Sequence, residues 1–321
     1  MTYTYLDWNV FNQIEKKDIL EEDTSAIFSK IERLIFDKKV ICPYSNAHIN
    51  DLLRGYSKNP QYISQHLGTL KRLTNNLCIV QYWGHTHITW HYRDVEEFFY
   101  SALKDKEAEA MSFTELLDWD DSGLSKKLFA ILQSSPIPAN FHEIYNANPI
   151  FNLLFPRTKL HMNGLALCED LYDLSINLNK DYSIYHLLKS YINQSLANLK
   201  NHQEVIMNVK NMVQEPPKHL NLDEAWNLYS PKNRVSDNPA YHEITNSYIK
   251  LDFRGYKSDV KFPNLIDDSL HAFYGAHCDF FITIDDKCYH KALETYRNLN
   301  ILTKVMKPQE FANQVFSQPE T

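Results

Sequence analysis

The sequence has 321 residues and a formal net charge of −7; 44% of the residues are hydrophobic and 23% are charged. This composition excludes an intrinsically disordered chain, and the net acidity argues against a protein that coats DNA with a basic surface. Only seven glycines occur and neither G-x-G-x-x-G nor G-x-x-x-x-G-K-S/T is present, which argues against a glycine-rich nucleotide-binding loop.

The N-terminal part of the chain alternates between strand and helix patterns. Residues 3–7 predict a short buried strand ending at Asp7, and a helix is expected from soon after Asn12 through residues 24–39. Residues 40–45 (VICPYS) predict a central parallel strand. Ser45 then occupies the N-cap position of a helix over residues 46–56. This alternation is typical of a parallel α/β sheet.

The pattern changes in the middle of the chain and returns near the end. Helical periodicity dominates from about residue 60 to 255, with one strand-like segment, LCIVQYWG, that continues towards HITWHY. After that we expect a helix within residues 263–278, a strand at 279–285, a helix at 287–299 and a last strand at 301–306. The prediction is therefore a discontinuous α/β core, residues 1–58 and 262–321, interrupted by a mainly helical insertion at residues 59–261.

Acidic residues flank the predicted strands of this core. In an open parallel sheet, sites form outside the carboxyl ends of the strands, so acids placed there are expected to converge. Clustered carboxylates repel each other by about 4 kcal/mol at 4 Å and an effective dielectric constant near 20. Mg²⁺ or Mn²⁺, which accept oxygen ligands, would relieve this repulsion. The candidates are Asp7, Asp51, Asp267, Asp268 and Asp285.

Four segments resemble, in order, the motifs of the PIN-like nuclease superfamily: YLDWNVF, VICPYSNAHINDLL, IDDSLHAFYGAHCDFFITIDDKCYHKA and NILTKVMKPQEFANQV. In that superfamily an Asp ends the first strand and Asn, Ser or Thr follows two residues later, as Asp7 and Asn9 do here. An acid, usually Glu, lies in the helix after the second strand, six residues after a Ser. Ser45 and Asp51 match these places, with Asp one methylene shorter than Glu.

The later motifs of the superfamily also have counterparts. A third Asp begins the helix that precedes a strand ending in Thr-x-Asp. Asp268 fits the place of this Asp, with Asp267 as the alternative register, and Thr283 and Asp285 match the strand end. The tail KPQEF follows the last strand as it does in the family. The resemblance covers about a third of the chain.

The resemblance implies a PIN-like three-layer α/β/α fold and a metal-dependent nuclease, with RNA favoured as substrate and single-stranded DNA as the alternative. It implies that Asp7, Asp51, Asp268 and Asp285, with Asp267 as the alternative, hold one or two Mg²⁺ or Mn²⁺ ions. The residues expected to orient the ligands or water, or to hold a carboxylate or phosphate, are Asn9, Ser45, His48, His271 and Thr283. Arg54 is the expected contact for the substrate backbone.

Three other interpretations compete with this one. A haloacid-dehalogenase-type phosphatase also has an Asp at a strand end, but it needs Asp-x-Asp, and residue 9 is Asn. A zinc site at His85, His87 and His91 lacks a nearby Cys or carboxylate in register. A PIN-like module that binds nucleic acid or protein without cutting stays open, because Asp51 replaces Glu and the insertion is large.

The compartment and the partners follow from the composition. Apolar runs stay below the ~18 residues that span a membrane, and no signal-peptide pattern is present. The five cysteines form no C-x-x-C pair, which fits reduced thiols. We expect a cytoplasmic protein without a membrane contact. Its acidic average still permits nucleic-acid binding through local patches and metal ions, and a regulatory protein partner or a homo-oligomer stays open.

Overall fold

The computed structural model describes residues 2–82, 84–108, 112, 113, 115, 123–137, 149–197 and 238–316. Trp83 and residues 198–237, which belong to the predicted insertion, lie outside the described residues. The chain forms two compact units, one made of Met1–Asp105, Ser230–Asp259 and Asn264–Thr321, and the other of Lys106–Tyr229 and Val260–Pro263. The first unit thus extends beyond the predicted core at residue 58; the division into nuclease core and insertion stays a prediction.

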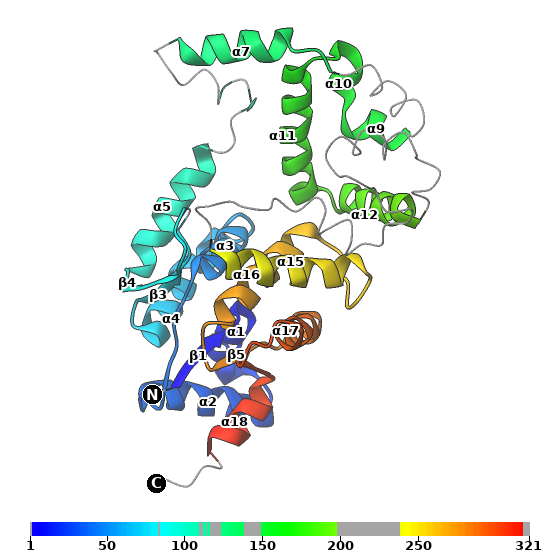
Figure 1. Cartoon of the computed structure of the whole chain (residues 1–321). Coiled ribbons are helices and arrows are strands. Elements are labelled where there is room, and N and C mark those ends of the chain that lie inside the picture. Colours follow the sequence, from blue (N-terminus) through cyan, green and yellow to red (C-terminus); the bar gives the residue numbers. More distant parts are fainter. Residues whose placement is uncertain are drawn as a thin grey trace. The chain divides into compact units, whose positions relative to one another are not determined.

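Figure 1 shows the fold, with helices and strands labelled where there is room. In chain order, the first unit contains all or most of β1 (Thr2–Leu6), α1 (Trp8–Glu15), the 3-10 helix η1 (Lys17–Ile19), α2 (Glu22–Phe36), β2 (Val40–Ile41), α3 (Asn46–Tyr56), the 3-10 helix η2 (Pro60–Tyr62), α4 (Ile63–Thr74), β3 (Leu77–Val80), β4 (Thr89–Tyr92), α5 (Val95–Ala108), α15 (Pro239–Phe253), α16 (Phe262–Gly275), β5 (Phe280–Ile282), α17 (Asp286–Asn298), β6 (Lys304–Met306) and α18 (Pro308–Phe316). The fold is mixed α/β and mostly helical.

A parallel sheet of four strands, in the order β2-β1-β5-β6, forms the centre of this unit. Its register pairs Thr4 with Phe280 and Phe280 with Lys304. The first strand of the chain is therefore paired with a strand that begins more than 270 residues later. This confirms the predicted parallel α/β sheet assembled from both ends of the sequence.

A second pair of strands adjoins this sheet. β3 and β4 form an antiparallel hairpin, and Tyr44, just beyond β2, makes a parallel bridge to Cys78 of β3. The backbone N–H groups of Tyr44 and Ile79 donate to Leu77 and Tyr44 carbonyls at 2.9 and 2.8 Å. The strand-like segment predicted in the middle of the chain therefore packs within the first unit.

The first helix begins earlier than the sequence suggested. We expected a helix to start soon after Asn12, but α1 starts at Trp8, directly after Asp7, whose extended backbone forms the N-cap. The η1 turn then separates α1 from α2. This break lets both helices bury their apolar stripes, such as Phe11 of α1 and Ile31 of α2, in one hydrophobic core.

Helix α16 also differs from the prediction. Asp267 and Asp268 were expected to open this helix, where its dipole favours negative charge. The helix instead begins at Phe262, because Pro263 is tolerated in a first helical turn, where its missing N–H needs no partner. The two acids therefore lie in the second turn of the helix. The prediction that they lie at its N-terminus was wrong.

Gly275 ends α16 next to Phe281 of β5 and Tyr296 of α17. A Cβ atom there would lie 2.7 Å from Cγ of Phe281 and 2.9 Å from Oη of Tyr296. We expect Gly275→Ala to lower the free energy of unfolding by about 1–3 kcal/mol through overpacking, measured by urea denaturation. Gly68→Ala in α4 is the matched control: its Cβ would meet no atom within 4 Å, so the same change should stabilise by about 0.5–1 kcal/mol. Equal effects at both sites would contradict this packing argument.

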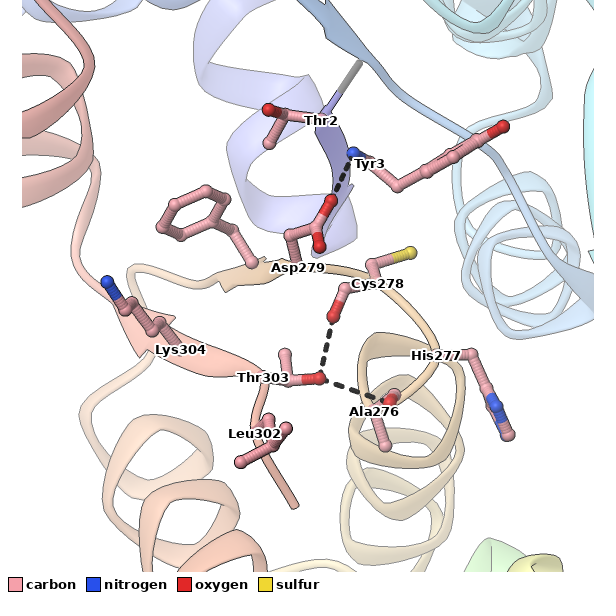
Figure 2. Close-up of a pocket in the computed structure, with 10 residues that line it drawn as sticks. Thr2, Tyr3, Ala276, His277, Cys278, Asp279, Leu302, Thr303 and Lys304 are labelled. Carbon is pink, nitrogen blue, oxygen red and sulfur yellow. Dashed lines mark hydrogen bonds between the residues drawn. The ribbon is translucent and has the colours of Figure 1, made fainter. Parts of the chain in front are cut away.

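A pocket of about 630 Å³ lies at the amino ends of β1, β5 and β6, the end of the sheet opposite Asp7 (Figure 2). Two polar side chains that line it form hydrogen bonds with backbone groups around the pocket. Asp279 accepts a hydrogen bond from Tyr3 N–H at 2.8 Å, and the Thr303 hydroxyl lies 2.6 Å from the Cys278 carbonyl oxygen. These contacts join the starts of the strands.

The second unit is helical where it is described. It contains α7 (Leu124–Ser134), α9 (Pro149–Leu154), α10 (Pro156–His161), α11 (Gly164–Lys180) and α12 (Tyr182–Ala197). Buried Asp170 of α11 accepts hydrogen bonds from the backbone N–H and the hydroxyl of Thr158, both at 2.7 Å. Because these bonds satisfy donors in the first turn of α10, they fix α10 against α11. Within the described parts of both units, no helix is long and apolar enough to cross a membrane.

Candidate functional site

Asp7 is held at the carboxyl end of β1 by its neighbours from β5. Its backbone N–H donates to the Ile282 carbonyl at 2.9 Å, and the Thr283 hydroxyl donates to Oδ2 of Asp7 at 2.8 Å. Nδ2 of Asn9 lies 3.4 Å from the same oxygen. The Asp7 side chain is nearly inaccessible to solvent, with 2% of the residue exposed. A carboxylate is thus fixed at the strand ends, where α/β folds place their sites.

Asp51 and His271 meet Asp7 from two different helices. Asp51 projects from α3 and His271 from α16. Nε2 of His271 lies 2.8 Å from Oδ2 of Asp51 and 3.7 Å from Oδ1 of Asp7. One potential ligand atom from each of the three side chains lies within 4.8 Å of the other two. We call these three residues the Asp-Asp-His group.

The pKa values of the group reflect burial and mutual charge. Burial raises the pKa of Asp7 above its usual value, and His271 opposes this. Burial also raises the pKa of Asp51, but the hydrogen bond and charge of His271, with the charge of Arg54, bring it below the usual value. For His271, burial lowers the pKa, yet Asp51 and Asp7 raise it overall. The two carboxylates therefore favour the protonated form of His271, whose positive charge offsets theirs.

Arg54 and Asp267 form the edge of the site next to α3. Arg54 pairs with Asp51, one turn before it, and its Nη1 lies 2.8 Å from Oδ2 of Asp267. Burial raises the pKa of Asp267 to about 6 even though Arg54 opposes this. Asn50, 3.4 Å from Asp267, also contacts it. The predicted substrate contact Arg54 thus lies at the site, with its guanidinium bound to two carboxylates.

Asp268 and Asp285 lie near the Asp-Asp-His group but outside its 4.8 Å limit. Burial raises the pKa of Asp268 well above its usual value, and the charges of Asp7 and Asp285 are among the causes. Asp285 caps α17 by accepting a hydrogen bond from Cys288 N–H at 2.8 Å. Successive helical residues point about 100° apart, so Asp267 and Asp268 cannot both face α3.

Ser45 and His48 serve the start of α3 rather than a carboxylate. Oγ of Ser45 accepts from Ala47 N–H at 3.2 Å, and Nδ1 of His48 accepts from Ser45 N–H at 3.0 Å. Nε2 of His48 is 2.7 Å from the Leu6 carbonyl oxygen, so it carries the proton. Burial lowers the pKa of His48 to about 3. Both nitrogens of this neutral ring bind backbone groups, and the expected contact of His48 with phosphate or a carboxylate stays a prediction.

Tyr5 is a site residue that the sequence analysis missed. Its hydroxyl oxygen lies 2.6 Å from Oγ of Ser45 and 2.9 Å from Nδ1 of His271. Burial raises its pKa well above the usual value, so the hydroxyl keeps its proton. The signal was present in the sequence: alternate residues of a strand share a face, so Tyr5 points to the same side as Asp7.

The chemistry of these donors fits a divalent cation. The Asp-Asp-His group offers two carboxylates and one imidazole, and Asp268 and Asp285 add further oxygen atoms nearby. Carboxylate oxygen is the preferred donor for Mg²⁺ and Mn²⁺, and imidazole nitrogen is accepted by Mn²⁺ and the later transition metals. Among the residues that the structure describes, this is the one group of at least three such side chains with suitable spacing.

Comparisons of the chain with protein-family models, with curated protein sequences and with solved structures gave no significant match.

Proposed function

We propose that this protein is a metal-dependent nuclease of PIN-like type that hydrolyses phosphodiester bonds, with RNA as the favoured substrate. One observation carries the proposal: Asp7, at the end of β1, and Asp51, on the helix α3 that follows the second strand, converge with His271 at the carboxyl ends of the strands. Bringing three buried or half-buried ionisable groups within 4.8 Å of one another costs desolvation and repulsion free energy. A site that binds a cation explains that cost.

Different residues of the site would have different roles in such a reaction. Asp7 and Asp51 would hold Mg²⁺ or Mn²⁺, with Asp268 and Asp285 completing the oxygen donors, and the bound ion supplies a nucleophilic water and neutralises charge on the phosphate. The Thr283 hydroxyl keeps Asp7 in the orientation seen here through its 2.8 Å hydrogen bond. Arg54 restrains Asp51 and Asp267, so it limits their movement when a substrate arrives.

The charge balance of the site favours one alternative, a PIN-like module that binds nucleic acid or protein without cutting. His271 and Arg54 already compensate Asp7, Asp51 and Asp267. A pseudoenzyme could keep these ion pairs for stability alone. In that case the protein would retain single-stranded RNA in a gel but would not cleave it when Mn²⁺ is added.

Asp285 and its neighbour Asp286 give a matched test of the two functions. Asp285→Asn keeps the helix cap, because Asn caps as well as Asp does, but it removes a charge beside Asp7. Asp286 is exposed and pairs with Lys257. We expect Mn²⁺-dependent cleavage of single-stranded RNA or DNA by the wild type, a fall of at least about 100-fold in Asp285→Asn, and little change in Asp286→Asn. Retardation without cleavage by the wild type would support the binding module instead.

A further inference from the structure

The imidazole of His271 is the feature of the site that carboxylate chemistry leaves unexplained. The ring is 1% exposed, and its Nε2 is directed at Asp51 and Asp7. An all-oxygen site suits Mg²⁺, whereas an imidazole donor adds affinity for transition metals and very little for Mg²⁺. The donor set of the Asp-Asp-His group therefore bears on which metal it takes.

A chain of hydrogen bonds behind His271 fixes which nitrogen faces the carboxylates. Nδ1 lies 2.9 Å from the Tyr5 hydroxyl oxygen, which in turn lies 2.6 Å from Oγ of Ser45. With the Tyr5 hydroxyl donating to Ser45, the Tyr5 oxygen accepts the proton carried by Nδ1. This leaves Nε2 as the nitrogen for the site. Metal-binding histidines in proteins usually donate their other N–H to such a partner, which orients the ring.

Packing holds the rings of Tyr5 and His271 in place. Tyr5 is fully buried and packs against the rings of Tyr274 and Phe281, with ring centroids 6.3 and 5.8 Å away. His48 packs edge-on against His271 at 4.9 Å, but its nitrogens are bound to backbone. It therefore supports the position of His271 without competing for the metal. The imidazole is held before any metal arrives.

We infer that Nε2 of His271 is a direct metal ligand together with Asp7 and Asp51, that Tyr5 is its positioning residue, and that the site selects Mn²⁺, Co²⁺ or a similar transition metal over Mg²⁺. This inference rests on the metal site of the proposed function and names its metal. Binding through Nε2 releases the proton of that nitrogen to solvent, while Nδ1 keeps its proton and donates to Tyr5. Asp51 then exchanges its bond to His271 for one to the metal.

Metal binding by the full chain tests the inference without an activity assay. After removal of metals with EDTA, we expect Co²⁺ to bind at least about 100-fold more tightly than Mg²⁺. His271→Gln should weaken Co²⁺ binding by about 100-fold and Mg²⁺ binding by less than about 5-fold. Tyr5→Phe keeps the ring but removes the hydroxyl that accepts from Nδ1–H and donates to Ser45, and it should weaken Co²⁺ binding by about 10–100-fold. Circular dichroism checks that each variant is folded.

Two matched controls and one direct measurement complete the test. His290→Gln on α17 and Tyr274→Phe, a second buried tyrosine, should leave the Co²⁺ to Mg²⁺ ratio unchanged. Pulsed EPR of Mn²⁺ bound to the wild type should detect one imidazole nitrogen, which needs no variant. Absence of that nitrogen signal, or equal binding of Co²⁺ and Mg²⁺, would overturn the inference.

Experiments can distinguish the metal-ligand role of His271 from the proposed nuclease activity. Imidazole ligation of Mn²⁺ without any cleavage of nucleic acid would support this inference and count against the proposed nuclease. Cleavage with limiting Mn²⁺ that His271→Gln leaves unchanged would support the nuclease and overturn the role of His271.

Discussion

Asp7→Asn is expected to reduce Mn²⁺-dependent cleavage by several orders of magnitude. The change keeps the size of the side chain and an oxygen that can accept from Thr283, but it removes the negative charge that would hold the cation. Asp279→Asn is the control at the opposite end of the same two strands, where Asp279 accepts a hydrogen bond from Tyr3 N–H. It should retain activity. Wild-type rates in Asp7→Asn would remove Asp7 from the chemistry.

The same variant should be at least as stable as the wild type when no metal is present. The pKa of Asp7 is raised in the folded protein, mainly by burial, so ionised Asp7 lowers stability at neutral pH. This cost is absent below the unfolded pKa of about 4 and complete above the raised folded value. The advantage of Asp7→Asn in metal-free urea denaturation should therefore be present at pH 7 and shrink towards pH 4. A clear loss of stability at pH 7 would contradict this electrostatic argument.

Lys291→Met is expected to cost about 3–5 kcal/mol of unfolding free energy, the range for breaking a buried ion pair. Lys291 of α17 is fully buried, pairs with Asp259, and lies 3.3 Å from Oδ2 of Asp252. Its Nζ also lies over the ring of Tyr248, 4.7 Å from the centroid. Removing the cation leaves two buried carboxylates without their common partner. This lysine therefore fastens α15 and the turn after it to α17.

Two further variants separate lost charge from lost packing at Lys291. Lys287→Met, four residues earlier on α17, removes a lysine that donates to the Ser258 carbonyl at 2.8 Å and is partly exposed. Its cost should stay below about 1 kcal/mol, as for surface contacts. Asp259→Asn added to Lys291→Met should restore part of the stability, because one unpaired charge is removed. A loss in Lys291→Met no larger than in Lys287→Met would show that the buried pair contributes nothing.

The elements of the first unit were predictable because their apolar patterns are strong and local. The strand before Asp7 and the helix after Ser45 lie within one residue of their predicted bounds, and the cap at Ser45 is formed as expected. The start of α16 was not predictable from its acids, because the helix tolerates Pro263 in its first turn and begins at Phe262, before both of them. Short-range signals therefore located the elements better than their ends.

The contacts of the site were only partly predictable. Strand order brings Asp7 close to residues of the last third of the chain, so its neighbourhood followed from the topology. Which acid faces which cation depends on the rotation of α16, and this placed Asp267 rather than Asp268 against Arg54. Tyr5 was missed because a buried tyrosine in a strand is ordinarily a core residue, and only its partner His271 makes it notable.

The pairing of β1 with β5 has a consequence for synthesis on the ribosome. The hydrogen bond between Thr283 and Asp7 joins residues 276 positions apart. At about 5–20 residues per second, the second partner is made roughly 14–55 s after the first. For most of that interval, from the synthesis of Asp51 to that of His271, the nascent chain has Asp7 and Asp51 but neither His271 nor the strand β5 that pairs with β1. The group formed by Asp7, Asp51 and His271 can therefore assemble only after most of the polypeptide has been synthesised.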